Sequence, residues 1–353
     1  MASLSLVGVV LLAGASVCLN SGCSTIGYYA QSVGGHLAIV RAARPVSEWL
    51  ADDRTSAALK ARLELSQRIR DFAVSALKEP DNASYRRYAD LKRPSAVWNV
   101  VAAPELSLTL QTWCFPVVGC VGYRGYYDRA EADAFAQGLR EQGLEVGVYG
   151  VPAYSTLGLL PGDSLKDPLL NTFIDQPEGE LARLIFHELA HQVAFAKGDT
   201  VFNESFATTV ERLGAERWLG ERAGPQARAE YEQAEARRAD FRALTSRYRE
   251  RFQALYDSTA SVAEKRSAKA ALLAELRADH EAMKRERWGG FSGYDGWFAH
   301  ANNAAFGVLA AYNQLVPNFE RLFEREGRDF SRFYAEVRRI AALPLPDRRN
   351  ALP

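Results

Sequence analysis

Residues 184–191 read LIFHELAH and contain the pattern His-Glu-x-x-His, formed by His187, Glu188 and His191. On an α-helix, residues four apart lie about one turn above each other, so both imidazoles project from the same face. Two imidazoles placed in this way can bind one metal ion, and the neighbouring Glu188 carboxylate can act on a water molecule at the same place. The stretch therefore predicts a metal site on a helix.

The residues around this pattern are apolar on almost every side, which indicates a buried core helix. Histidines and a carboxylate in such a helix need polar partners, because unpaired buried polar groups are costly. A metal ion satisfies all three. The alternative is a pair of core histidines bonded to nearby backbone, with Glu188 at a solvent edge. We expect the helix to begin with Asp175 as N-cap and Pro177 in its first turn, and to end at residues 197–199 (Lys-Gly-Asp).

A catalytic zinc site needs a third protein ligand and one open position. The best candidate is Glu204, which opens a second helical pattern that runs to Trp218. Two helices joined by a tight turn return antiparallel, so an acid at the start of the second can face the end of the first. Asp199 and Glu211 remain alternatives, and Glu204 could also be only a first-turn acid that stabilises its own helix dipole.

With these motifs the chain resembles a family of bacterial zinc-dependent aminopeptidases predicted from sequence, a gluzincin-like group with HELAH followed by NESFA. The resemblance spans most of the chain through GYY at 27–29, RAARP at 41–45, WNV at 98–100, TWCFP at 112–116, PAYSTLG at 152–158 and YNQLVP at 312–317. It implies a peptidase that removes N-terminal residues and binds one Zn²⁺ through His187, His191 and Glu204, with Glu188 as catalytic acid and base. The expected fold is α+β, mostly helical and zincin-like, with a small mixed sheet and a helical hairpin.

Composition sets wide limits on function. The 353 residues suit one large domain or two small ones, and 48% of them are hydrophobic, which is ordinary for a globular protein. Lys plus Arg and Asp plus Glu both number 43, so net charge gives no reason to expect a nucleic acid partner.

The N-terminus resembles a lipoprotein signal peptide. Residues 4–19 are apolar and lead to Asn-Ser-Gly-Cys at 20–23, so we expect residues 1–22 to be removed and Cys23 to be lipidated. No Lys or Arg precedes Arg41, and the alternative is an uncleaved membrane anchor, since the run is near the minimum for spanning a bilayer. We expect a metallopeptidase domain at 24–353, tethered to the bacterial cell envelope and facing the periplasm. Ser24 favours the outer membrane.

Cys114 and Cys120 flank a short loop. In an oxidising compartment they would close it as a disulfide. The alternatives are two free thiols or soft metal ligands separate from the histidine site.

Hydrophobic periodicity predicts the remaining elements. Residues 32–77 follow a helical pattern, whereas 96–101 and 106–110 are typical of short strands. A helix at 131–142 precedes a strand at 145–149. Residues 217–287 are rich in Ala, Glu, Arg and Lys with a sparse apolar stripe, which indicates two long antiparallel helices that could restrict access to the cleft.

The sequence indicates the substrate contacts less clearly than the metal ligands. Residues 150–158 precede the metal helix, where an edge strand could pair with an extended substrate, and Tyr154 could donate to an oxyanion or simply pack in the strand. Residues 302–316 form an apolar helical pattern in which Asn302, Asn303 and Tyr312 are either substrate contacts or a helix cap and a buried tyrosine. His300 is expected to be structural.

Three classes of function remain open. An aminopeptidase needs a carboxylate that holds the substrate α-amine, for which Glu105, Asp163, Asp167 and Asp199 are candidates, but the G-x-M-E-N anchor of the large aminopeptidases is absent. The nearest alternative is an endopeptidase of envelope proteins. The other is a non-catalytic, zinc-stabilised lipoprotein, against which Glu188 argues because purely structural zinc sites are cysteine-rich and fully coordinated.

Overall fold

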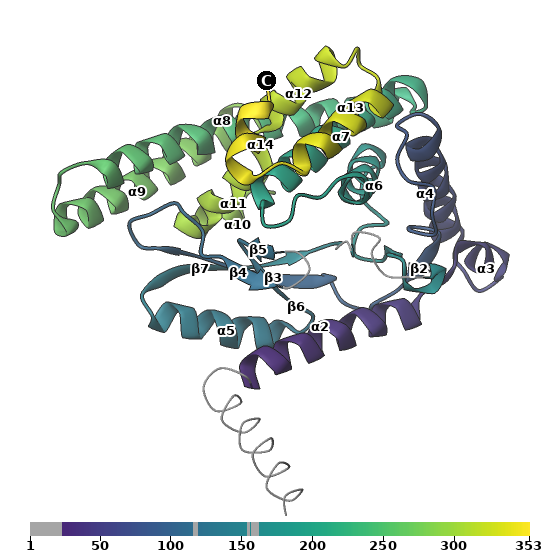
Figure 1. Cartoon of the computed structure of the whole chain (residues 1–353), viewed down its shortest axis with the longest axis horizontal. Coiled ribbons are helices and arrows are strands. Elements are labelled where there is room, and N and C mark those ends of the chain that lie inside the picture. Colours follow the sequence, from purple (N-terminus) through teal and green to yellow (C-terminus); the bar gives the residue numbers. More distant parts are fainter. Residues whose placement is uncertain (1–22, 116–118, 154–155, 157–161) are drawn as a thin grey trace, which may run out of the picture.

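The computed structural model describes residues 23–115, 119–153, 156 and 162–353 (Figure 1). The predicted signal peptide (1–22) and Tyr154 lie outside the described residues. Within those ranges, no helix combines the length and apolar character needed to cross a membrane. The protein is mostly helical, with small sheets, so its α+β class is confirmed.

The first half of the chain contains α2 (Cys23–Ala42), β1 (Arg44–Pro45), α3 (Val46–Ala51), α4 (Ala57–Ser75), β2 (Arg87–Ala89), β3 (Val97–Pro104), β4 (Trp113–Phe115), β5 (Gly119–Val121), β6 (Arg124–Tyr126), α5 (Arg129–Glu141) and β7 (Leu144–Val151). The second half contains η2 (Asp163–Leu165), β8 (Leu169–Leu170), α6 (Glu178–Val193), α7 (Thr200–Glu221), α8 (Pro225–Asp257), α9 (Val262–Glu286), α10 (Asp295–Ala299), α11 (Asn303–Asn313), α12 (Val316–Arg325), α13 (Phe330–Ala341) and α14 (Leu345–Ala351).

The main sheet has the strand order β6-β3-β7 and is antiparallel throughout. Val100 of β3 is opposite Val148 of β7, and Trp98 is opposite Tyr126 of β6. Helix α5 contacts β3 and β7, and α11 also contacts both strands; in Figure 1 they lie on opposite sides of the sheet. Strand β7 is therefore an edge strand of a sheet covered on two faces.

Helices α6 and α7 form the centre of the largest hydrophobic core. Leu181, Ile185 and Leu189 of α6 and Phe206 of α7 are fully buried. Gly214 allows close packing of α7, because a Cβ there would lie 2.7 Å from Leu77 Cδ1 and 2.8 Å from Phe186 Cδ2. The helix that bears the histidines is thus held on most sides by apolar contacts.

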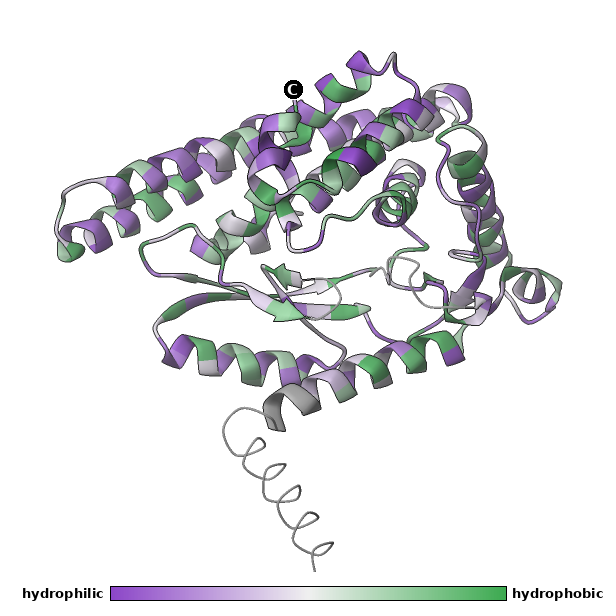
Figure 2. Cartoon of the chain, viewed as in Figure 1, coloured by the Kyte–Doolittle hydropathy of each residue, from purple (hydrophilic) through white to green (hydrophobic). Residues whose placement is uncertain are grey.

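Helices α8 and α9 form the long hairpin expected from the sequence, although it begins at Pro225, because α7 continues to Glu221. Ser261 and Glu264 form a capping box at the start of α9. Hydrophobic residues of the hairpin form a separate core with α10 and α11, which includes Phe241, Phe252 and Phe306. Figure 2 shows hydrophilic residues along much of both helices.

The structure corrects two sequence predictions about the N-terminal half. Residues 32–77 are not one helical segment: Pro45 and the turn at 52–56 divide them into α2, α3 and α4. Residues 106–110 are not a strand, whereas β3 continues to Pro104. Leu108 is buried among the hairpin residues. The apolar residues at 106–110 therefore reflect burial against the hairpin and not pairing in a sheet.

The boundaries of α6 also differ from prediction. Pro177, and not Asp175, is the N-cap, and the helix ends at Val193, four residues before Lys197. The connection to α7 is irregular, with Gly198 at φ 74°. Asp199 then caps α7 by accepting a hydrogen bond from the Phe202 backbone. As a result Glu204 lies one turn inside its helix, where it can face α6.

Candidate metal centre

His187 and His191 on α6 and Glu204 on α7 bring three donor atoms together. The two Nε2 atoms are 3.2 Å apart, and Glu204 Oε2 lies 3.4 Å from His187 Nε2 and 3.7 Å from His191 Nε2. The three side chains are at most 11% exposed. Antiparallel packing of the two helices produces this arrangement, as the sequence predicted.

These distances fit the ligand set of a single metal ion. Donor atoms about 2.0–2.2 Å from a tetrahedral zinc ion lie about 3.3–3.6 Å from one another. Glu204 Oε2 is buried and has no hydrogen-bond partner among the described residues, which is costly unless another group satisfies it. Two imidazoles and one carboxylate are donors that zinc prefers, so the residues present fit the ion.

The two alternative third ligands have other partners. Asp199 forms ion pairs with Arg348 at 2.8 Å and Arg349 at 2.6 Å, and it also caps α7. Glu211 Oε2 accepts a hydrogen bond from His187 Nδ1 at 2.9 Å, on the other side of the ring. Glu204 is therefore the carboxylate that faces both Nε2 atoms.

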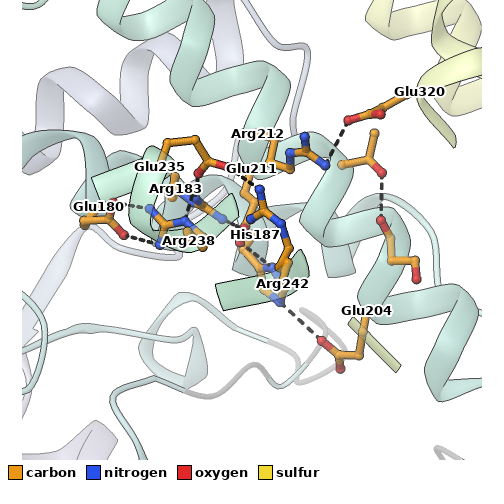
Figure 3. A network of polar contacts seen from close by, with 12 residues as sticks. Glu180, Arg183, His187, Glu204, Glu211, Arg212, Glu235, Arg238, Arg242 and Glu320 are labelled. Atoms are coloured by element: carbon orange, nitrogen blue, oxygen red, sulfur yellow. Dashed lines mark hydrogen bonds and ion pairs between the residues drawn. The ribbon is translucent and has the colours of Figure 1, made fainter. Parts of the chain in front are cut away.

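Glu211 belongs to a network that joins the histidine to the hairpin (Figure 3). Arg183 of α6 binds Glu211 on one side and Glu235 of α8 at 3.0 Å on the other. Glu235 also binds Arg238 at 2.8 Å and Arg242 at 2.5 Å. The root of the hairpin thus fixes Arg183, which holds Glu211 against the ring of His187.

Burial and neighbouring charges set the protonation of the centre. Burial lowers the pKa of His191 to about 4. Burial acts in the same direction on His187, but the neighbouring carboxylates of Glu204 and Glu211 outweigh it and raise its pKa well above the ordinary value. A proton on His187 and a metal cation would therefore compete for the same place, so metal affinity should fall in acid.

Glu188 lies beside these donors and has a different environment. Burial raises its pKa to about 7, and the nearby charge of His187 opposes that rise. A carboxyl group with a pKa near neutrality can both accept and return a proton. The centre therefore contains two carboxylates in distinct roles, one facing both imidazoles and one beside them.

A cavity of about 270 Å³ opens next to the centre and is lined by His187, Glu188, His191 and Glu204. Tyrosines form much of its remaining wall: Tyr28, Tyr123, Tyr127 and Tyr312. The Tyr312 ring lies 6.1 Å from that of His187 at an interplanar angle of 18°. Tyr312 is thus at the centre, whereas Tyr154 lies outside the described residues.

A second cavity adjoins the first. Both are lined by Val151, Ala153, His187, Glu188 and Tyr312. Val151 is the last residue of edge strand β7, so this strand ends between the two cavities. An extended chain could therefore pass the donor atoms with space on either side.

The other candidate residues have structural roles. Asn302 caps α11 by accepting a hydrogen bond from the Ala305 backbone N–H. The side-chain amide of Asn303 donates hydrogen bonds to the carbonyls of Pro104 and Glu105. His300 is exposed after α10.

A disulfide joins Cys114 and Cys120 across the β4–β5 hairpin. The two cysteines are therefore neither free thiols nor metal ligands in this structure.

None of the four suggested α-amine anchors lines either cavity, within the described part of the chain. Glu105 pairs with Arg266 and Asp199 with the C-terminal arginines. Asp167 accepts from Thr156, and Asp163 is exposed in η2. The structure gives no support to these anchors.

A second group of possible ligands consists of His280, Glu281 and Asp295. Glu281 lies 3.8 Å from Nδ1 of His280, whereas Asp295 lies 3.4 Å from its Nε2, so the two carboxylates approach opposite sides of the ring. Asp295 also pairs with Lys284. This arrangement does not suit a single ion.

Sequence reasoning missed several residues at the centre. Arg183 is one turn before His187 on α6, but its partners Glu211 and Glu235 lie on α7 and α8, so its local spacing gave no signal. Tyr28 and Tyr123 carried no local signal, because distant elements bring them to the cavity.

Comparison with known proteins identifies a family over most of the chain. The profile of a family described as "putative aminopeptidase" matches residues 27–352. No curated protein and no solved structure matches the chain significantly. The matched region contains all three donor residues, Glu188 and nearly every described element. The chain therefore belongs to the family described as putative aminopeptidases.

Proposed function

We propose that the protein is a zinc-dependent peptidase that removes N-terminal residues from peptides. The observation that carries this proposal is the convergence of His187 Nε2, His191 Nε2 and Glu204 Oε2 next to Glu188 at the wall of a cavity. Membership of the family supports peptidase chemistry. The motif and the donor set support zinc.

In this proposal His187, His191 and Glu204 hold one Zn²⁺, which when bound supplies Lewis-acid polarisation of the scissile carbonyl. Glu188 accepts a proton from the attacking water at its carboxylate and returns it to the leaving amine. Glu211 keeps Nδ1 of His187 protonated, so that Nε2 presents its lone pair to the ion. Tyr312, which lines both cavities, is the proposed substrate contact, and its hydroxyl can donate a hydrogen bond to the developing oxyanion.

An endopeptidase is the second candidate, and the paired cavities favour it. Space on both sides of Glu188 would accommodate residues before and after the scissile bond. An aminopeptidase would instead use a carboxylate to hold the α-amine. The family description supports the exopeptidase.

This proposal also includes a zincin-like fold and a division of the chain into a signal peptide and a metallopeptidase domain at 24–353. It includes the cellular location as well. We propose a lipoprotein attached through Cys23 to the bacterial cell envelope, facing the periplasm and most consistent with the outer membrane. The signal-like sequence at 1–23 and the disulfide support export. The hairpin, whose Arg238 lines the second cavity, would restrict access to the cleft.

A direct test compares matched peptides with free and acetylated N-termini, incubated with zinc-loaded protein and analysed by mass spectrometry. An aminopeptidase removes the first residue of free peptides only. An endopeptidase cleaves both at internal bonds. Cleavage of neither peptide, with zinc bound, would support the non-catalytic lipoprotein and contradict the proposal.

A further inference from the structure

We infer that the cavity wall formed by α2, β3 and the β6 region is a subsite for an uncharged, apolar or aromatic substrate side chain next to the scissile bond. This inference rests on the proposed peptidase function and specifies its substrate class. It is carried by the position of α2, by a glycine in the wall and by the distribution of charge in the cavity.

Helix α2 reaches the cavity because Gln31 attaches it to β6. Gln31 Nε2 donates to the Gly125 carbonyl at 3.2 Å, and its Oε1 accepts from the Tyr127 backbone at 3.1 Å. Tyr28 and Ser32 lie three residues before and one residue after Gln31, and both line the cavity. An N-terminal helix remote in sequence from the metal motif therefore forms part of the site.

Close packing keeps this wall in place and leaves space beside it. A Cβ on Gly35 of α2 would lie only 2.1 Å from the Tyr127 ring, so glycine lets the helix approach. A Cβ on Gly125, which also lines the cavity, would lie 3.1 Å from Val97 Cγ1 and 3.3 Å from Asn99 Oδ1. The absence of side chains at both positions shapes the subsite.

Among the residues that the structure describes, charge in the cavity lining is confined to the metal centre. Among the described lining residues, only His187, Glu188, His191 and Glu204 are ionisable acids or bases other than tyrosine. The nearby Arg124 guanidinium lies 4.0 Å from the centre of the Tyr28 ring and is not part of the lining. The described lining residues of this wall carry no charge that could pair with a Lys, Arg, Asp or Glu side chain packed against them. Such a side chain would lose water at the wall, whereas an apolar or aromatic one would pack on the tyrosines.

Ser32 allows the charge of the subsite to be changed. Its Oγ donates to the Tyr28 carbonyl at 2.8 Å within the helix, so it contributes no charge. The adjacent Val33 points to solvent and is 59% exposed. Ser32→Asp and Val33→Asp therefore add the same charge one residue apart, the first in the cavity and the second outside it.

The test uses the full-length, zinc-loaded protein and aminoacyl-coumarin substrates bearing Leu, Phe, Ala, Lys or Glu, with otherwise identical peptides that place these residues internally. We expect kcat/KM for Leu and Phe to exceed that for Lys and Glu by at least about 100-fold in the wild type. Ser32→Asp should reduce the Leu-to-Lys ratio at least about tenfold, and Val33→Asp should leave it unchanged. Ser32→Leu, which adds no charge, should lower the rate for Phe relative to Ala.

A binding measurement separates this inference from the proposed function. Calorimetric titration of Glu188→Gln with Leu- and Lys-containing tripeptides, with and without Ser32→Asp, reports the subsite without turnover. A Leu preference that Ser32→Asp reduces supports the subsite even if no peptide is hydrolysed, an outcome that would contradict only the peptidase proposal. Equal binding of Leu and Lys peptides, or a preference that neither Ser32 variant changes, would overturn the subsite.

Discussion

Oε2 of Glu211 lies 2.9 Å from Nδ1 of His187, on the opposite side of the ring from the Nε2 atom that faces His191 and Glu204. A carboxylate in this position fixes the tautomer and orientation of the imidazole and increases its basicity as a ligand. Arg183 in turn holds Glu211.

Glu211→Gln should therefore weaken zinc binding by about 10- to 100-fold, because the amide cannot stabilise the Nδ1 proton as a carboxylate does. Competition with a chromophoric chelator measures the dissociation constant. Glu221→Gln on the same helix is the matched control and should leave affinity unchanged, because Glu221 is remote from the donors and pairs with the exposed Arg217. Equal affinities for the wild type and Glu211→Gln would show that Glu211 does not support the ligand.

Glu188→Gln should keep the metal and lose nearly all turnover, because the amide has the same size but cannot accept a proton. His187→Ala should lose both metal and activity. The measurements are zinc content and peptide hydrolysis on the same preparations. Substantial hydrolysis by Glu188→Gln would exclude this carboxylate as the proton acceptor.

The network at the root of the hairpin predicts a specific sensitivity to acid. Burial would raise the pKa of Glu235, but hydrogen bonds from Arg242 and Arg238 outweigh it and lower the pKa to about 2. A carboxyl group with a folded-state pKa below its unfolded value of 4.5 stabilises the fold above about pH 4.5. That contribution is lost as pH falls from about 4.5 to about 2.

Glu235→Gln should therefore lower the urea midpoint near neutral pH and reduce its further decrease between about pH 5 and pH 3. Glu232→Gln, at an exposed position on the same helix, serves as the control. Parallel loss of stability in the wild type and Glu235→Gln over this range would contradict the role given to the ion pairs.

Two glycines in helices should respond oppositely to alanine. Gly214→Ala places a Cβ against the buried Leu77 and Phe186 and should destabilise the protein by about 1–2 kcal/mol, despite the better helix propensity of alanine. Gly138→Ala in α5 meets no atom within 4 Å and should stabilise by about 0.5–1 kcal/mol. Thermal unfolding of both variants tests whether close approach of α7 to α6 and α4 requires Gly214.

The sequence predicted the elements whose signals are local. His187, Glu188 and His191 share one helix, and Glu204 follows a short connection, so helical geometry alone brought these residues together. The hairpin was predicted because residues 217–287 combine a charged composition with a sparse apolar stripe. The role of Asp199 was not predictable from local signals. It was considered as a metal ligand, but it pairs with Arg348 and Arg349, which lie about 150 residues further along the chain.

The cavity wall could not be predicted in the same way. Tyr28, Tyr123 and Tyr312 come from three distant segments and meet only when α2, the β6 region and α11 pack around the sheet. The local sequence around each tyrosine does not indicate which distant element it will pack against. The same limit applies to Arg183, whose partner Glu235 belongs to the hairpin.

Zinc content measured by inductively coupled plasma mass spectrometry on dialysed protein tests the metal centre most directly. The wild type should retain one zinc per chain, and His191→Ala and Glu204→Ala should each retain far less, while the folded helical content measured by circular dichroism persists. A wild type that binds no zinc, or a Glu204→Ala variant that retains a full equivalent with unchanged affinity, would contradict the assignment of this site.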